Sequence, residues 1–198
     1  MSSLLYIRSS IFQDQGQSSL LADDYLSHWR AENPDGQVVL RDLVANPLPH
    51  LDLPRFQAFA TPIEKRSPEQ QALAEQADFL ILELESADQL LIGLPMYNFT
   101  MPTQLKSYFD YVARAGRTFR YTANGPEGLL KNKRATVIAT RGGFYKGTVQ
   151  DTQTGLVTML LGFLGIEDVK FIYAEGISIS AEQKEKSLQT ARSELKAA

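Results

Sequence analysis

Residues 88–94 read DQLLIGL, and residues 95–102, PMYNFTMP, follow them directly. A short, continuous apolar run without a helical period is typical of a parallel strand that is buried on both faces of a sheet. Further strands are indicated, by a similar apolar run or by alternation, at 4–8, 37–43, 134–140 and 169–174. The sequence therefore predicts a sheet of five strands.

Helices are expected between these strands. Apolar residues recur at helical spacing in the segments 18–32, 68–85, 100–112 and 151–164. We expect Thr100 to cap the third of these helices and Gly165 to end the fourth. The sequence Ser180-Ala-Glu-Gln183 fits a capping box that begins a fifth helix.

Two segments are expected to leave the sheet and return to it. Residues 45–68 are rich in proline and show little periodicity, so we expect an irregular surface excursion there. The turn signal Asn124-Gly125-Pro126 predicts a small hairpin within 118–128.

This alternation of strands and helices predicts the fold class. Strands that alternate with helices pair in parallel, with helices on both faces of the sheet. Right-handed crossovers leave few topologies, and five strands favour the order 2-1-3-4-5. We therefore predict an α/β protein with a doubly wound five-stranded parallel sheet. Its 198 residues suit one domain, 1–198, and are too few for two.

The composition excludes several kinds of function. The net charge of −3 argues against nucleic acid as the main partner, because phosphate backbones are bound by clustered Lys and Arg. The chain has no cysteine and two histidines, His28 and His50, so thiolate chemistry is excluded and a metal site built from histidines is not expected. Carboxylate metal sites stay open on composition alone, but no metal site is predicted. The apolar stretch at 4–8 is too short for a signal peptide, and no run approaches the ~20 apolar residues of a membrane span. We expect a cytoplasmic protein that does not enter a membrane.

The loop after the first strand has the features of a phosphate site. Doubly wound sheets bind ligands at the carboxyl ends of their strands, where the strand order reverses. Residues 9–19 lead there into a helix N-terminus, whose free amides favour a phosphate, and Ser10 and Ser18 add neutral donors. The loop contains neither G-x-x-x-x-G-K-[ST] nor G-x-G-x-x-G, so NTP hydrolysis and a Rossmann dinucleotide site are not supported. Taken alone, a capped loop without a ligand explains it equally well.

The loops after the third and fourth strands suit a flat ring. Residues 95–102 offer aromatic and thioether side chains, with Asn98 for the edge of the ring, although a rigid core-packing turn is the alternative. Residues 140–145 include Gly142-Gly143, which allows close approach of a ligand, although a simple glycine turn also explains the pair. Arg141 is suited either to a cofactor phosphate or to a structural ion pair. The three loops together describe a site for flavin mononucleotide, FMN.

Several motifs identify a family that the chain resembles. They are PMYNF at 95–99, LK at 105–106, YFD at 108–110, RAG at 114–116, TFRY at 118–121, GP at 125–126, GL at 128–129 and RGG at 141–143. With them the chain resembles the flavodoxin-like FMN-dependent NADH azoreductases and NADH:quinone oxidoreductases, over essentially its whole length.

The resemblance implies an enzyme in which the flavin carries the chemistry and no side chain is a catalytic acid or base. It implies two-electron, ping-pong hydride transfer through flavin N5, from NADH or NADPH to quinones or nitroaromatics, or to azo compounds, which are cleaved to amines. It also implies a homodimer with sites at the interface. Family members often have Ser at the position of Gly16, so weaker FMN binding is expected here.

The loops and the resemblance together give the predicted site residues. The phosphate is expected to meet Ser10, Gly16, Gln17 and Ser18. The flavin ring is expected to meet Met96, Tyr97, Asn98, Phe99, Thr140, Arg141, Gly142 and Gly143. The substrate slot over the ring is expected to be lined by Tyr121 and Phe163.

Two other classes of protein share this predicted fold. A flavodoxin-type electron carrier also binds FMN, but it cycles single electrons and turns over no substrate. A receiver-type signalling domain needs acidic residues at the end of the first strand, where this chain has Arg8-Ser9-Ser10. We therefore favour a reductase over an electron carrier or a receiver domain.

Overall fold

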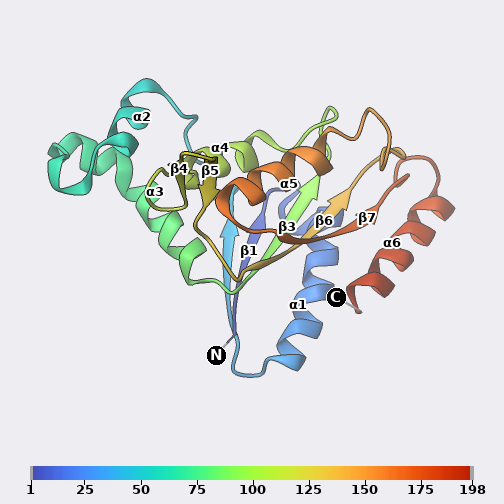
Figure 1. Cartoon of the computed structure of the whole chain (residues 1–198). Helices are drawn as coiled ribbons and strands as arrows, with labels where there is room; N and C mark the ends of the chain where they lie inside the picture. The colour runs from blue at the N-terminus through green and yellow to red at the C-terminus, as the bar shows by residue number, and fades with distance from the viewer. Residues whose placement is uncertain (1, 197–198) are drawn as a thin grey trace.

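Five parallel strands form the central sheet, in the order β2-β1-β3-β6-β7 (Figure 1). We describe them from a computed structural model, which covers residues 2–196. The strands are β1 (Ser3–Arg8), β2 (Gln37–Asp42), β3 (Gln89–Pro95), β6 (Arg134–Thr140) and β7 (Asp168–Ala174). Counted without the hairpin strands β4 and β5, this is the predicted order 2-1-3-4-5. The predicted doubly wound α/β sheet is confirmed.

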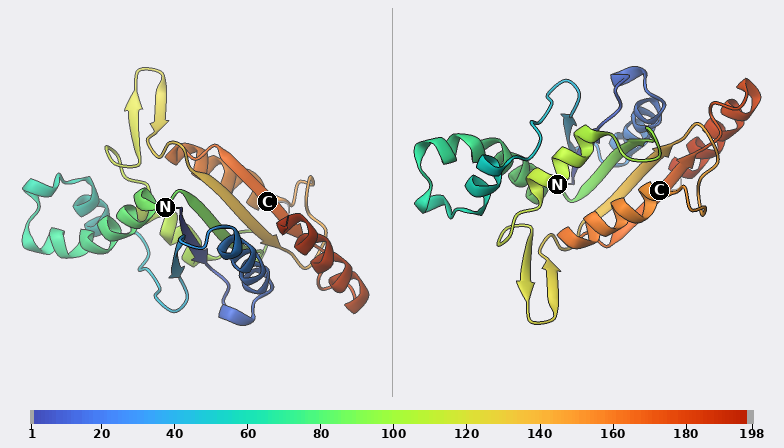
Figure 2. Two further views of the ribbon diagram at one scale, coloured as in Figure 1. Left: turned by 90° about the horizontal axis from the view of Figure 1, so that it is seen from below. Right: turned by 90° about the horizontal axis from the view of Figure 1, so that it is seen from above.

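Helices cover both faces of the sheet (Figure 2). One face packs against α1 (Gln17–Glu32) and α6 (Ala181–Leu195), with Trp29 in that core. The other face packs against α3 (Pro68–Ser86), α4 (Thr103–Val112) and α5 (Thr152–Leu164). Successive strand residues alternate between the two cores, as Leu90 and Leu91 of β3 do, which is why the strand sequences read as continuous apolar runs.

The proline-rich segment 45–68 contains a helix that the sequence analysis missed. Helix α2 (Leu53–Ala60) begins after Asp52, whose side chain accepts a hydrogen bond from the amide of Arg55 at 2.9 Å. Pro54 lies in the first turn, where its missing N–H costs nothing. The prediction of purely irregular structure was therefore wrong, because proline marks the start of this helix.

The helix ends follow the predictions with one exception. Gly165 ends α5 in the left-handed conformation, with φ 101°, and the Ser180 side chain accepts from the amide of Gln183 at 3.1 Å. Thr100 does not cap α4, which begins at Thr103 after Pro102. Thr100 instead pairs with Tyr97 through two backbone hydrogen bonds of 3.1 Å, because the chain makes a tight turn between them.

A hairpin of β4 (Phe119–Thr122) and β5 (Gly125–Gly128) projects from the body of the protein, as Figure 2 shows, and confirms the predicted hairpin. Its base rests on the end of α5. A Cβ atom added to Gly128 would lie 2.0 Å from the backbone nitrogen of Gly165, so only glycine fits this crossing. In the described residues, no helix has the length and apolar character to cross a bilayer.

Candidate functional site

A cavity of about 260 Å³ opens at the carboxyl ends of β1, β3, β6 and β7. This is the edge of the sheet at which open α/β folds bind ligands. The residues that line it are Ser10, Phe12, Gln17, Pro95, Met96, Tyr97, Thr140, Gly142, Ile177 and Ser178. The structure therefore brings residues from all three predicted loops to one hollow.

The N-terminus of α1 presents unused hydrogen-bond donors to this hollow. Gly16 is the N-cap residue and contributes no side-chain cap. The amides of Gln17 and Ser18 donate to no acceptor within residues 2–196. The hydroxyl of Ser18 is also buried without a hydrogen-bond partner in this part of the chain. Unpaired buried donors at a positive helix end favour an anion.

Ser10 occupies the space beside Gly16. A Cβ atom on Gly16 would lie 2.2 Å from Oγ of Ser10, so this pair leaves no room for a larger residue at position 16. The Ser10 hydroxyl lies 3.3 Å from the hydroxyl of Tyr97, which also accepts from the amide of Ile11 at 3.2 Å. Tyr97 thereby ties the loop after β1 to the loop after β3.

The loop after β3 is a tight turn that leaves the Phe99 side chain exposed. Asn98 and Phe99 both have positive φ angles, of 49° and 68°. The two bonds between Tyr97 and Thr100 close the turn, and the amide of Met96 donates to the Thr140 carbonyl at 2.9 Å. Met96 and Tyr97 line the cavity, whereas Asn98 and Phe99 form the tip of the turn outside it.

The paired glycines after β6 offer free amides beside the cavity. The carbonyl groups of Gly142 and Gly143 accept from the amides of Ser178 and Gly176, at 3.1 and 3.0 Å. Their own amides donate to nothing within residues 2–196. A Cβ on Gly142 would lie 2.9 Å from Oγ of Ser178, so the close approach of these two loops requires glycine.

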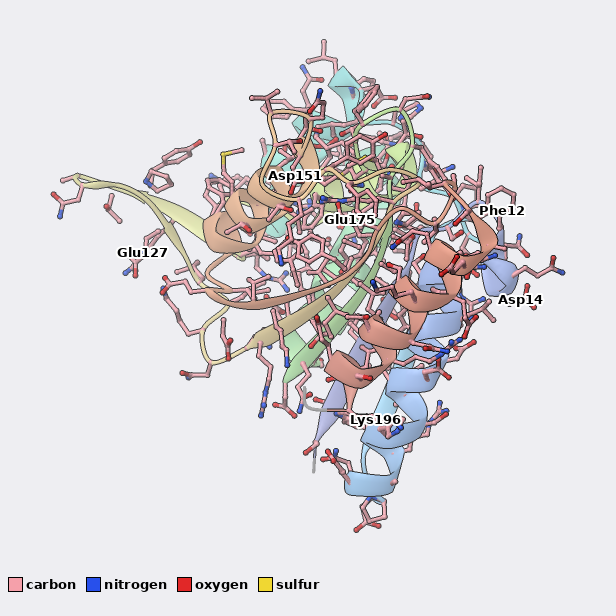
Figure 3. All side chains as sticks on the ribbon, turned by 90° about the vertical axis from the view of Figure 1, so that its right-hand side faces the viewer. Phe12, Asp14, Glu127, Asp151, Glu175 and Lys196 are labelled. Carbon is pink, nitrogen blue, oxygen red and sulfur yellow. The ribbon has the colours of Figure 1, made fainter. Side chains whose placement is uncertain are left out.

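Arg141 forms structural ion pairs, which is one of the two roles that the sequence left open; the other was a contact with a cofactor phosphate. Its side chain is fully buried and pairs with Asp151 at 2.7 Å and with Glu175 at 3.1 Å. Figure 3 shows these two carboxylates near each other between α5 and the end of β7. Burial opposes ionisation of Asp151, but hydrogen bonds from Arg141 and Thr154 outweigh it and lower the pKa of this carboxyl. The guanidinium is therefore committed to the protein and not to a ligand.

Tyr121 and Phe163 lie away from this cavity within one chain. Tyr121 is 75% exposed on the hairpin and borders a second hollow, of about 380 Å³. Phe163 packs on Phe119 with ring centroids 4.2 Å apart. Their role in a substrate slot stays a prediction, and in this fold it requires a second chain.

The sequence analysis missed one wall of the cavity. Ile177 and Ser178 follow β7, and Phe12 lies in the loop after β1. The loop after the last strand of a parallel sheet also lies at the carboxyl edge, so strand order alone could have indicated it. Among the described residues, no group of His, Asp and Glu side chains is arranged to hold a metal ion.

Comparison with protein families finds one match over nearly the whole chain. The family model described as flavodoxin-like fold matches residues 2–198. An FMN-dependent NADH:quinone oxidoreductase of Cellvibrio japonicus is 47% identical, over 98% of this chain and 97% of that protein. One of the same description from Alcanivorax borkumensis is 50% identical, over 97% of both chains.

Solved structures with the same fold include two azoreductases, one of them with bound FMN. The crystal structure of an FMN-dependent NADH-azoreductase from Bacillus anthracis, in complex with FMN, aligns with a TM-score of 0.90 and 26% identity. The alignment covers 100% of this chain and 97% of the other. An azoreductase from Bacillus anthracis str. Sterne aligns with a TM-score of 0.91 and 25% identity, over 100% of this chain and 98% of that one.

Proposed function

The chain belongs to the flavodoxin-like fold family and, within it, to the FMN-dependent NADH:quinone oxidoreductases, and we propose that it holds FMN in the cavity at the carboxyl edge of its sheet. The whole chain, 1–198, would serve as one FMN-binding domain. Its activity would be the reduction of quinones with NADH.

The observation that carries this proposal is the set of unused donors around the cavity. On the side of α1, the amides of Gln17 and Ser18 and the buried hydroxyl of Ser18 have no partner among the described residues. On the side of β6, the amides of Gly142 and Gly143 have none within the same part of the chain. A phosphate would satisfy the first set, and the carbonyl edge of an isoalloxazine would satisfy the second. The residues present therefore fit FMN.

The remaining lining residues would hold and orient the ring. Met96 and Tyr97 offer apolar surface for its face, and Thr140 lies at the end of the strand beneath it. The Tyr97 hydroxyl, through Ser10, would keep the phosphate loop and the ring loop at a fixed separation. Such pre-organised contacts reduce the entropy lost when a cofactor binds.

FMN, when bound, would supply the redox chemistry, taking up a hydride from NADH and passing two electrons to the second substrate in a ping-pong order. The protein would stabilise the more negative reduced cofactor through the amides of Gly142 and Gly143. Among the described residues that line the cavity there is no His, Asp, Glu, Lys or Arg, and the Tyr97 hydroxyl already contacts Ser10 and the Ile11 amide, so no side chain is assigned proton transfer.

Azo compounds and nitroaromatics are proposed as further oxidants. The fold of this chain matches solved azoreductases at TM-scores of 0.90 and 0.91. Quinones, azo bonds and nitro groups all accept two electrons from a reduced flavin, so they would compete for one slot. NADH is the proposed donor, and NADPH is a second candidate to compare with it.

A homodimer would complete the substrate slot. Tyr121 is 75% exposed and Phe56 is 58% exposed around the second hollow, which is a large apolar surface for a free monomer. We propose that a second copy covers this surface and receives Tyr121 and Phe163 near its cavity. Gel filtration at working concentration tests this, and a mass near the 22.1 kDa of one chain would contradict it.

An absorbance spectrum of the purified protein, followed by anaerobic NADH, tests the proposed function. Flavin bands near about 370 and 450 nm that bleach with one equivalent of NADH and return with a quinone would support it. Parallel double-reciprocal lines at varied NADH would support the ping-pong order. A colourless protein that takes up no added FMN would overturn the proposal, and flavin that NADH does not reduce would favour the electron carrier.

A further inference from the structure

Gln153 is an uncharged side chain that is buried between the two loops proposed to hold the ring. It lies in the first turn of α5 and is 0% exposed. Its Nε2 donates to the carbonyl of Pro95 at 2.9 Å and to that of Thr100 at 3.1 Å. Its Oε1 accepts from Nε of Arg141 at 3.2 Å. The contacts to Pro95 and Arg141 are buried, and the contact to Thr100 is partly buried.

These three bonds join the two walls of the cavity. Pro95 and Thr100 mark the beginning and the end of the turn that carries Met96 and Tyr97. Arg141 immediately precedes Gly142 and Gly143. One amide group therefore holds the turn after β3 and the glycine loop after β6 at a fixed separation.

Arg141 extends this connection to the rest of the glycine loop. Its Nη1 bonds Glu175, which accepts from the amides of Tyr145 and Lys146 at 2.9 Å each. Through Arg141 and Glu175, Gln153 is therefore connected to both ends of the glycine loop.

An amide is the group that this position requires. Two carbonyl oxygens need a donor, and the Arg141 guanidinium needs an acceptor. Glutamate would keep the acceptor but lose both donors, and methionine would lose all three bonds while filling a similar volume. Gln153 itself does not line the cavity, so any effect on a ligand has to pass through the loops.

We infer that Gln153 is a positioning residue that sets the spacing between Met96–Tyr97 and Gly142–Gly143, and thereby the affinity and the reduction potential of the bound flavin. The inference rests on the proposed function. Ring contacts and amide donors act over a few tenths of an ångström, so a small shift of one wall weakens several contacts together. The amides of Gly142 and Gly143 act more strongly on the reduced, more negative flavin, so their displacement also lowers the midpoint potential.

The variants Gln153→Met and Gln153→Glu test this role. Apoprotein is titrated with FMN by fluorescence quenching, and the midpoint potential of the reconstituted protein is measured by dye equilibration. We expect the dissociation constant to rise about tenfold or more in both variants, with a lower midpoint potential. Gln153→Glu keeps the acceptor for Arg141, loses the donors to Pro95 and Thr100, and adds a third carboxylate around Arg141, whereas Gln153→Met loses all three bonds without adding a charge.

Two control variants separate positioning from general stability. Gln150→Met removes an exposed glutamine three residues before Gln153, just ahead of α5, and should change neither quantity. Gln70→Ala weakens the capping box of α3, far from the cavity in sequence and in fold, and should lower the melting temperature without changing the flavin potential. A folded Gln153 variant with wild-type affinity and potential would overturn the inference, as would a loss of affinity that Gln70→Ala reproduces at equal loss of stability. Failure of the wild-type chain to bind FMN would instead overturn the proposed function on which the inference rests.

Discussion

The substitution Arg141→Met should destabilise the fold strongly at neutral pH. The guanidinium is 0% exposed and pairs with Asp151 and Glu175, whose side chains are 7% and 12% exposed. Methionine fills part of the volume but leaves two carboxylates buried and close together without a cation. Breaking a buried ion pair in this way costs about 3–5 kcal/mol. For a domain of this size, that corresponds to a fall in melting temperature of about 10 °C.

The loss should depend on pH in a defined direction. The pKa of Asp151 is lowered in the folded state, because hydrogen bonds from Arg141 and Thr154 outweigh the opposing effect of burial. A lowered pKa contributes stability above the unfolded pKa, and this contribution disappears as the pH falls through the folded pKa. The Arg141→Met variant lacks it at every pH. The difference in stability between wild type and variant should therefore be largest near neutrality and should shrink in acid.

Thermal unfolding followed by circular dichroism, at pH 7.5 and at about pH 3, below the ordinary aspartate pKa of 3.8, measures both effects. The matched control is Arg192→Met, which removes the same side chain from an ion pair with Asp24 that is 42% exposed on both sides. That variant should lose less than about 1 kcal/mol, because exposed ion pairs contribute little. Equal melting temperatures for the two variants, or a loss in Arg141→Met that grows in acid, would refute the reasoning.

Three further predictions concern close contacts and unused donors. Gly16→Ala places a Cβ 2.2 Å from Oγ of Ser10, so it should cost about 1–3 kcal/mol and weaken FMN binding; adding Ser10→Gly should restore much of the stability, and a double variant no better than the single one would contradict the clash. Ser18→Ala removes a buried hydroxyl with no protein partner, so the melting temperature of the apoprotein should hold while the FMN dissociation constant rises by about fivefold or more; an unchanged constant in a fluorescence titration would remove Ser18 from the phosphate site. Gly128→Ala places a Cβ 2.0 Å from the Gly165 nitrogen, so unfolding in urea should show a loss above about 2 kcal/mol, and a neutral result would contradict the crossing geometry.

The central strands could be predicted from the sequence because β1, β3 and β6 are buried on both faces, whereas the largely exposed β2 was indicated by alternation. A strand buried on both faces reads as an apolar run, as 134–140 does, and that range was predicted to the residue. The Gly165 stop and the hairpin turn were predicted for a related reason, since both depend on local backbone chemistry. Conformations that depend only on neighbouring residues in the sequence can be predicted without knowing the tertiary structure.

Two local features of the chain were predicted incorrectly. Thr100 has the right chemistry for a helix cap, but its backbone pairs with Tyr97 in a tight turn, and α4 begins later. Helix α2 was missed because it covers only eight positions and prolines surround it, although Asp52 and Pro54 mark its start. In both cases the local residues fit two conformations, and their pattern alone does not choose between them.

The candidate site was predicted by its loops and not by every residue in them. Phosphate-loop and ring-loop residues meet at one cavity because the strand order determines which loops are neighbours. The role of Arg141 could not be predicted in this way, because its partners Asp151 and Glu175 are separated from it by 10 and 34 residues. Nothing in the sequence around Arg141 distinguishes a buried ion pair from a ligand contact.

The strand order also has a consequence for how the protein is made. β1 lies between β2 and β3, so the centre of the sheet can close once residue 95 has left the ribosome, and β6 and β7 then add in turn to one edge. The wall formed by Ile177 and Ser178, and the apolar face that α6 covers, come from segments that follow all five strands of the sheet in chain order. Nascent chains fold from the N-terminus as they emerge, so a growing chain would carry an incomplete cavity and an open apolar face until residues 177–195 have emerged. A chain cut before residue 177 would therefore lack one wall of the cavity in which the cofactor is proposed to bind.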